Sequence, residues 1–155
     1  MNKSYPYVVF LPAQQKNKIL SAIFGSKAAV NILEFSLSEG ISNKIYQSDV
    51  IKKLAYSNKT IIENFKSLTN LGIFTERMEK ARKKKRTVWV KTYRLSDTGK
   101  WFALLLAKEE DISEKEKAEI LQTIFRAYIK WVKDLSEKLC VEMKTLIDIF
   151  NDEIQ

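Results

Sequence analysis

The fold of this chain is decided by residues 57–74, which read SNKTIIENFKSLTNLGIF. Ser57 is a residue type that caps helix N-termini, and Gly72 is the type that ends helices in a left-handed conformation. The apolar residues between them recur at helical spacing: Ile61, Phe65 and Leu68. The stretch therefore predicts a helix over 58–71 with one apolar face that packs against a core.

The other face of this helix is polar. Together with the helix start, it supplies nine candidates for contact with DNA: Ser57, Asn58, Lys59, Thr60, Glu63, Asn64, Lys66, Ser67 and Asn70. Lys suits guanine or phosphate, Asn suits adenine, and Glu can accept a hydrogen bond from cytosine. A solvated helix face would also be polar, so both interpretations stay open for the helix alone.

Upstream of this helix the sequence predicts two more helices. The first spans about 27–38, the second spans 49–56, and a very short strand at 45–47 lies between them. Ser48 is the expected N-cap of the second helix. Gln47 and Ser48 are further candidates for DNA contact, because they stand at the N-terminus of that helix.

Downstream of the same helix the pattern changes from helical to extended. Residues 73–79 and 87–95 predict two strands, and the second is rich in β-branched and aromatic residues. Between them, 80–86 reads KARKKKR, so we expect a hairpin that carries cations at its tip. Eight cations of the tip and its two flanking strands are candidate DNA contacts: Arg77, Lys80, Arg82, Lys83, Lys84, Lys85, Arg86 and Lys91.

Charge is distributed unevenly along the chain. Residues 1–108 carry 20 Lys/Arg against 7 Asp/Glu, whereas residues 109–155 carry 7 against 12. A basic body followed by an acidic segment indicates two surfaces with different roles. A bare basic run can be a solvated surface or a nuclear-localisation-like patch, but a cationic hairpin beside a polar helix favours double-stranded DNA as the partner.

The composition argues against several other function classes. Histidine is absent, which removes the commonest general base and the usual zinc ligand. The single cysteine, Cys140, can form neither an internal disulfide nor a multi-cysteine metal site. We therefore expect no enzyme activity, no cofactor and no metal. No apolar run is long enough to span a bilayer and no signal peptide is recognisable, so we expect a cytoplasmic protein.

The predicted order is helix, short strand, helix, helix, basic hairpin, helix, which is that of a winged helix-turn-helix. The expected fold class is mainly α with a small β-hairpin wing (α+β), extended by a long C-terminal helix. We expect an N-terminal arm and short helix over 1–22, a winged-helix domain over 23–108, and a helical dimerisation segment over 109–155. The tryptophans are expected in the core: Trp89, Trp101 and Trp131.

Several stretches resemble a known family. SNKTI at 57–61 and LTNLGIF at 68–74 resemble the "S-x-x-T-V … L-x-x-L-G-L-V" signature of winged-helix regulators of the MarR and ArsR type. YRLSDTGK at 93–100 resembles their "Y-x-L-T-x-x-G-R" ending, and residues 24–29 and 47–55 are similar to their first two helices. The resemblance covers about half of the chain and implies a DNA-binding transcriptional regulator with the helix over 58–71 as recognition helix.

Two departures limit what the resemblance implies. Glu63 and Asn64 stand where these regulators often carry Arg or a small residue, so the operator sequence does not follow from the family. The metal-binding cysteines and histidines of ArsR-type proteins are also missing, which argues against metal sensing.

The C-terminal segment carries a long apolar stripe. Residues 114–151 predict one long helix or two abutting helices. Six stripe residues follow a 4-3-4-3-4 spacing and three more continue it after a four-residue stutter: Leu121, Phe125, Tyr128, Val132, Leu135, Leu139, then Met143, Leu146 and Phe150. The preferred interpretation is a homodimer interface, and the alternative is a helix that folds back onto its own domain.

These features favour a dimeric, sequence-specific DNA-binding regulator, most simply a repressor that blocks promoter access. One alternative is a non-specific or architectural DNA-binding protein that organises a chromosome or plasmid. Another is a winged-helix module for protein interaction. No residue set indicates a pocket for a small-molecule effector.

Overall fold

The structure is a computed structural model that describes residues 20–22, 24–107 and 112–155. The expected N-terminal arm therefore lies outside the described residues, apart from its last three. The chain divides into two compact units, the first ending at Ile120 and the second covering Leu121–Gln155. The boundary expected between residues 108 and 109 stays a prediction.

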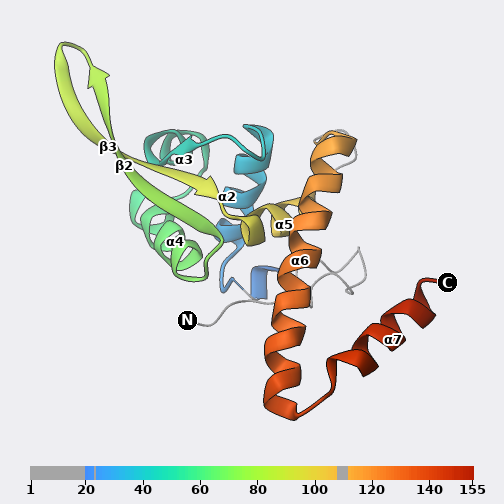
Figure 1. The fold of residues 1–155 in the computed structure, drawn as a ribbon. Coiled ribbons are helices and arrows are strands. Elements are labelled where there is room, and N and C mark those ends of the chain that lie inside the picture. Colours follow the sequence, from blue (N-terminus) through green and yellow to red (C-terminus); the bar gives the residue numbers. More distant parts are fainter. Residues whose placement is uncertain (1–19, 23, 108–111) are drawn as a thin grey trace. The chain divides into compact units, whose positions relative to one another are not determined.

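The first unit has the predicted winged helix-turn-helix fold, mostly helical with a small three-stranded sheet. In Figure 1 the hairpin of its last two strands extends away from the helices. Its elements follow the predicted order: α2 (Lys27–Ser38), β1 (Ile45–Tyr46), α3 (Gln47–Lys53), α4 (Asn58–Asn70), β2 (Phe74–Lys83), β3 (Arg86–Leu95) and α5 (Asp97–Leu106).

The core of this unit lies between the helices and the base of the hairpin. The apolar face predicted for α4 is confirmed, because Ile61, Phe65 and Leu68 are fully buried. On α5, Trp101 is buried as expected, and the ring of Phe102 packs edge-on against another core ring. Burial of the apolar face of α4 leaves its polar face directed outward.

The start of α3 differs from the expectation. The helix begins at Gln47 rather than at residue 49, and its N-cap is Tyr46, which makes no side-chain capping bond. The prediction that Ser48 caps this helix is therefore wrong. The helix also ends earlier than expected, at Lys53, and the hydroxyl of Tyr56 instead accepts a hydrogen bond from Asn31 Nδ2 at 2.8 Å.

The hairpin is longer and its turn tighter than the sequence indicates. Ten residue pairs join β2 to β3, from Phe74↔Leu95 to Lys83↔Arg86, so most of the basic run lies in the strands and not in a loop. Lys84 and Lys85 alone form the turn, with φ angles of 50° and 58°. Two successive left-handed residues are typical of the type I′ turn, whose twist matches that of paired strands.

A close junction joins the end of α4 to the start of α5. Gly72 adopts a φ of 76°, and the Ile73 amide donates to the Leu68 carbonyl at 2.9 Å, as in a Schellman motif. The Ile73 carbonyl in turn accepts from the Ser96 amide at 2.9 Å. A Cβ on Gly99 would lie 2.0 Å from that carbonyl oxygen, so only glycine fits there. The LGIF and YRLSDTGK stretches thus meet at one point.

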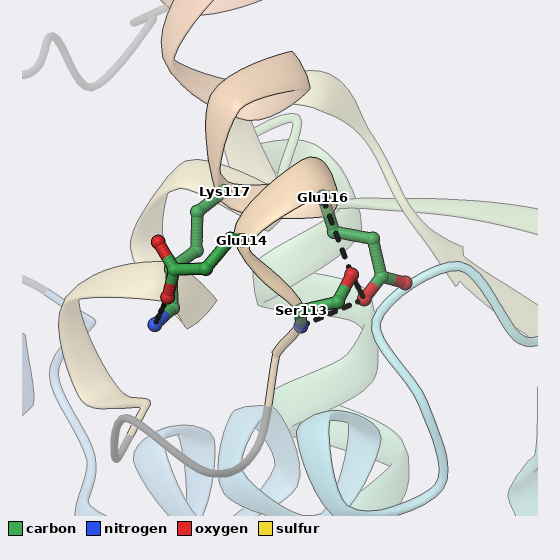
Figure 2. Close-up of polar contacts among 4 residues, drawn as sticks. All are labelled: Ser113, Glu114, Glu116 and Lys117. Carbon is green, nitrogen blue, oxygen red and sulfur yellow. Dashed lines mark hydrogen bonds and ion pairs between the residues drawn. The ribbon is translucent and has the colours of Figure 1, made fainter.

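Helix α6 (Glu114–Leu139) begins with a capping box, shown in Figure 2. The Ser113 hydroxyl accepts from the Glu116 amide at 3.3 Å, and the Glu116 carboxylate accepts from the Ser113 amide at 3.0 Å. The hydrogen bonds from Ser113 lower the pKa of Glu116. Lys117 Nζ also lies 2.7 Å from Glu114 Oε1. The capping box and this ion pair both stabilise the first turn of α6.

The second unit contains the rest of α6 and a separate helix, α7 (Met143–Glu153). Cys140 takes a left-handed φ of 55°, and the Val141 amide donates to the Ser136 carbonyl at 2.9 Å, which ends α6. Of the two expected arrangements, the structure therefore has two helices. None of the helices in the described residues is long and apolar enough to cross a membrane.

The apolar stripe is not continuous along one helix. The last three residues were expected to continue it after a four-residue stutter, but they lie on the separate helix α7. The ring of Phe150 in α7 lies 5.9 Å from the ring of Phe125 in α6, so α7 turns back toward α6. Ser136 also donates to the sulfur of Met143 at 3.2 Å, just beyond the turn. The last three stripe residues therefore belong to a helical hairpin within the second unit.

Candidate nucleic-acid interface

Helix α4 is held against the base of the hairpin by aromatic contacts. The ring of Phe65 stacks on the ring of Tyr93 in β3, with centres 3.9 Å apart and planes 11° apart. The same Phe65 ring meets Phe74 of β2 edge-on at 5.6 Å. The helix and the hairpin therefore belong to one packed body.

Most of the predicted polar face of α4 is exposed to solvent. The exposed candidates on the helix are Asn58, Lys59, Glu63, Lys66, Ser67 and Asn70. Lys59 Nζ lies 3.9 Å from Glu63 Oε1, one helical turn away. The attraction in an exposed ion pair at this distance is weak, so it restrains the two side chains little. The side chains on this face can therefore reorient toward a partner.

Three other candidates use their polar groups within the protein. The Ser57 hydroxyl accepts from the Thr60 amide at 3.1 Å and lies 2.8 Å from the Thr60 hydroxyl. Asn64 is half-buried and donates to the Thr60 carbonyl at 2.8 Å. These residues cap and brace the first turns of α4, and this role competes with contact to bases.

The exposed face of α4 also contains an apolar residue that the sequence interpretation missed. Ile62 is 45% exposed. At 100° per residue its side chain falls between those of Asn58 and Lys66, at the edge of the polar face that adjoins the buried face. The helical spacing could have identified it, since Ile62 is out of phase with the buried Ile61 and Phe65. An apolar side chain here suits the methyl group of thymine.

The two candidates on α3 lie beside the base of the hairpin and are half-exposed. Gln47 Oε1 lies 3.1 Å from the Tyr93 hydroxyl, which also donates to Glu76 Oε2 at 2.9 Å. Burial and the contact with Glu76 raise the pKa of Tyr93, so this hydroxyl stays protonated. Gln47 thus links α3 to the hairpin, and Ser48 follows it in the first turn of the helix.

All eight predicted cations of the wing are exposed. The two acidic residues of the hairpin lie toward its base and are paired: Glu76 Oε1 lies 3.0 Å from Lys91 Nζ, and Glu79 Oε2 lies 2.6 Å from Lys44 Nζ. The hydrogen bond from Lys44 lowers the pKa of Glu79. No Asp or Glu occurs between residues 80 and 96, so the outer half of the hairpin carries only positive charge.

One tryptophan lies in the wing rather than in the core. Trp89 is 62% exposed, so the expectation that it lies in the core is wrong. Trp131, which was also expected in the core, is half-buried. The physical reason for the exposure of Trp89 is strand alternation: the neighbours Val88 and Val90 turn to the other face of β3 and are half-buried. Lys80 Nζ lies 5.2 Å from the centre of the Trp89 ring, within range of a cation–π contact.

The candidate dimer residues form an apolar surface on the second unit. Six are exposed and three are half-buried: exposed Leu121, Phe125, Tyr128, Leu139, Met143 and Phe150, and half-buried Val132, Leu135 and Leu146. Of the fourteen large apolar side chains found exposed in the described residues, eleven lie in this unit. That density is unusual for a surface that faces only water.

Within the residues that the structure describes, no group of three or more Cys, Asp or Glu side chains is arranged to hold a metal ion. The interface above therefore consists of cations, amides, hydroxyls and exposed apolar groups.

No protein-family model matches the chain, and no curated protein matches it. Among solved structures, the chain is similar to the adhesin competence repressor of Streptococcus pyogenes, with 15% identity and a TM-score of 0.38. The match covers 92% of this chain and 96% of that one.

Proposed function

We propose that this protein is a dimeric, sequence-specific DNA-binding transcriptional regulator that acts in the cytoplasm as a repressor. The observation that carries the proposal is that the exposed polar face of α4 and the cationic hairpin belong to one packed body, joined by the Phe65–Tyr93 stack. Both can therefore contact one duplex at the same time.

The dimensions of the two elements suit this role. A helix of 13 residues such as α4 is about 20 Å long and fits the major groove. Strands of 10 residues extend for about 33 Å, so the outer half of the wing reaches the flanking phosphates or the adjacent minor groove. Farther out than the Glu79↔Val90 pair, the hairpin residues 80–89 include no Asp or Glu, so the cations there have no acidic neighbour on the hairpin to compete with phosphate.

The proposed dimer forms through the second unit. Its exposed apolar residues would be buried against the same surface of a second copy, as in a two-fold interface. Two copies of α4 related in this way would read two half-sites about 34–36 Å apart, one helical turn of DNA. A dimer bound across a promoter blocks access of the transcription machinery, which is the simplest form of repression.

The test of base recognition uses two variants of the α4 face. Lys59→Ala and Asn70→Ala should lower the ratio of specific to non-specific affinity, because each good base contact supplies about 1–3 kcal/mol of discrimination. Lys27→Ala, which removes an exposed lysine from α2, is the matched control and should leave the ratio unchanged. If neither α4 variant changes the ratio, base recognition by this helix is wrong.

The test of the dimer uses the exposed stripe of α6. Leu121→Asp combined with Leu139→Asp should convert the dimer to a monomer in sedimentation velocity, because charges would replace two exposed apolar contacts. Gln122→Asp, at an exposed polar position beside Leu121, should remain dimeric. A wild-type protein that sediments as a monomer at micromolar concentration would refute the interface.

The architectural alternative shares the same DNA-binding surface and differs in specificity. It predicts the same salt-sensitive binding without preference for one sequence. A protein-interaction module is the less economical alternative, since it leaves the wing cations without a partner.

A further inference from the structure

Three large apolar side chains are exposed in the described part of the first unit, and all three lie on the proposed DNA surface. They are Ile62 on α4, and Met78 and Trp89 on the wing, with exposures of 45%, 50% and 62%. Single exposed apolar residues are ordinary on protein surfaces. Their restriction to the two elements proposed to contact DNA, and the size of Trp89, indicate a further role in binding.

The strand register gathers the wing residues on one face. Trp89 is paired with Lys80, and Met78 is paired with Lys91 two rungs closer to the base of the hairpin. Alternate residues of a strand project to the same side, so these four side chains share a face of the hairpin with Tyr93. Tyr93 is the residue that packs on α4 at the base of the wing. Trp89 therefore lies farther out on the side of the hairpin that carries α4.

The surroundings of Trp89 suit a nucleic acid base. Lys80 is 5.2 Å from the ring centre, and no acidic residue follows Glu79 in the hairpin. A ring between cations can stack on a base while the cations neutralise the phosphates on either side. Apolar side chains that contact DNA in this way enter between base steps and partly unstack them.

We propose that Trp89 stacks on a base at a locally unstacked step of the duplex, with Met78 packed beside it, where the wing meets DNA. The inference rests on the proposed DNA-binding function and deepens it. It assigns to the wing a preference for DNA that is easy to unstack, such as a mismatch or a flexible pyrimidine–purine step, in addition to the contacts with phosphate.

The experiment compares two duplexes of identical length and flanking sequence, one fully paired and one with two adjacent T·T mismatches. The full chain should bind the mismatched duplex about tenfold more tightly, a size within the range measured for base–aromatic stacking. Trp89→Ala should reduce this ratio to about one, and Trp89→Phe should retain most of it. Since Trp89 is exposed, both variants should keep the wild-type circular dichroism and urea midpoint.

Fluorescence gives a second readout. Binding of the mismatched duplex should quench part of the tryptophan emission of the wild type, and Trp89→Phe should lose that quenching, because the two remaining tryptophans lie outside the wing. If wild type and Trp89→Ala have the same ratio of affinities for mismatched and paired duplex, the stacking inference is wrong. In that case, salt-sensitive binding of both duplexes would still support the proposed function. A wild type that binds neither duplex at low salt would overturn both.

Discussion

The ring of Phe65 in α4 stacks on the ring of Tyr93 in β3 with 3.9 Å between their centres, and both residues are buried. One ring belongs to the helix and the other to the wing, so any change in the angle between the two elements would break the stack. The contact therefore sets the spacing between the α4 face and the wing cations.

Removing the Tyr93 ring should damage the protein more than removing its hydroxyl. Tyr93→Ala should lower the free energy of unfolding by about 3–5 kcal/mol, as for other large aromatic truncations. Tyr93→Phe keeps the stack and loses only the bonds to Glu76 and Gln47, so it should cost about 0.5–1.5 kcal/mol. Urea unfolding measures both. If the two variants lose equal stability, the hydroxyl network and not the stack joins the elements.

Gly99→Ala should be destabilising although the position is helical. The added Cβ would lie 2.0 Å from the backbone oxygen of Ile73, which cannot move without disturbing the end of α4. We expect a loss of about 1–3 kcal/mol in the free energy of unfolding. Thr98→Ala, half-exposed in the same helix, is the control and should change stability by less than about 0.5 kcal/mol. An unchanged Gly99→Ala protein would argue against the close junction.

Substitutions in the turn of the wing can remove two positive charges without disturbing the turn conformation. Lys84 and Lys85 have left-handed φ angles, a conformation that Asn-Gly adopts more readily. The double variant Lys84→Asn/Lys85→Gly should therefore unfold at the same or higher urea concentration. It should also reduce the slope of log affinity against log salt by about one to two, if each lysine neutralises one phosphate.

The control for the turn variant is Lys84→Arg/Lys85→Arg, which keeps both charges and should keep the wild-type slope. A slope that is unchanged when both charges are removed would place the phosphate contacts elsewhere on the hairpin.

Stability should fall as the solution becomes acidic. The folded state lowers the pKa of Glu79 through its hydrogen bond from Lys44, and that of Glu116 through its bonds from Ser113. For Glu76, burial acts in the opposite direction but is outweighed by bonds from Lys91 and Tyr93. Because the unfolded chain then takes up protons first, the free energy of unfolding should decline as pH drops below the ordinary value of 4.5.

The measurement is urea unfolding at pH 7 and at several values below pH 4.5. Glu79→Gln should show a shallower decline than the wild type, since it no longer titrates. A wild type with constant stability down to pH 3 would contradict the carboxylate contacts.

Sequence alone predicted correctly the features of α4 that depend on residues close together in the chain. Ser57 as N-cap and Gly72 as the left-handed residue after α4 were both predicted and are confirmed, with the helix ending one residue early at Asn70. The apolar spacing identified the buried face of α4 for the same reason. These features depend only on neighbours within a few residues.

Prediction from sequence failed where tertiary pairing overrides local preference. Lys84-Lys85 carries none of the usual turn residues, so the two-residue turn was not recognised and the strands were predicted too short. The choice between one helix and two over residues 114–151 stayed open, because Cys140 is not a residue type that usually takes the left-handed φ that ends α6. Trp89 was placed in the core because of its residue type, although strand alternation with Val88 and Val90 leaves it exposed.

The central claim is that α4 and the wing form one surface for a specific duplex, presented by a dimer. The most direct measurement selects binding sites from a random duplex pool at 50 and 200 mM salt, with the oligomeric state determined in the same samples. We predict enrichment of one palindromic motif by a dimer, with an affinity about 10³-fold or more above that for random duplex. Tight binding without enrichment would contradict sequence-specific regulation, and no binding at 50 mM salt would contradict the DNA surface itself.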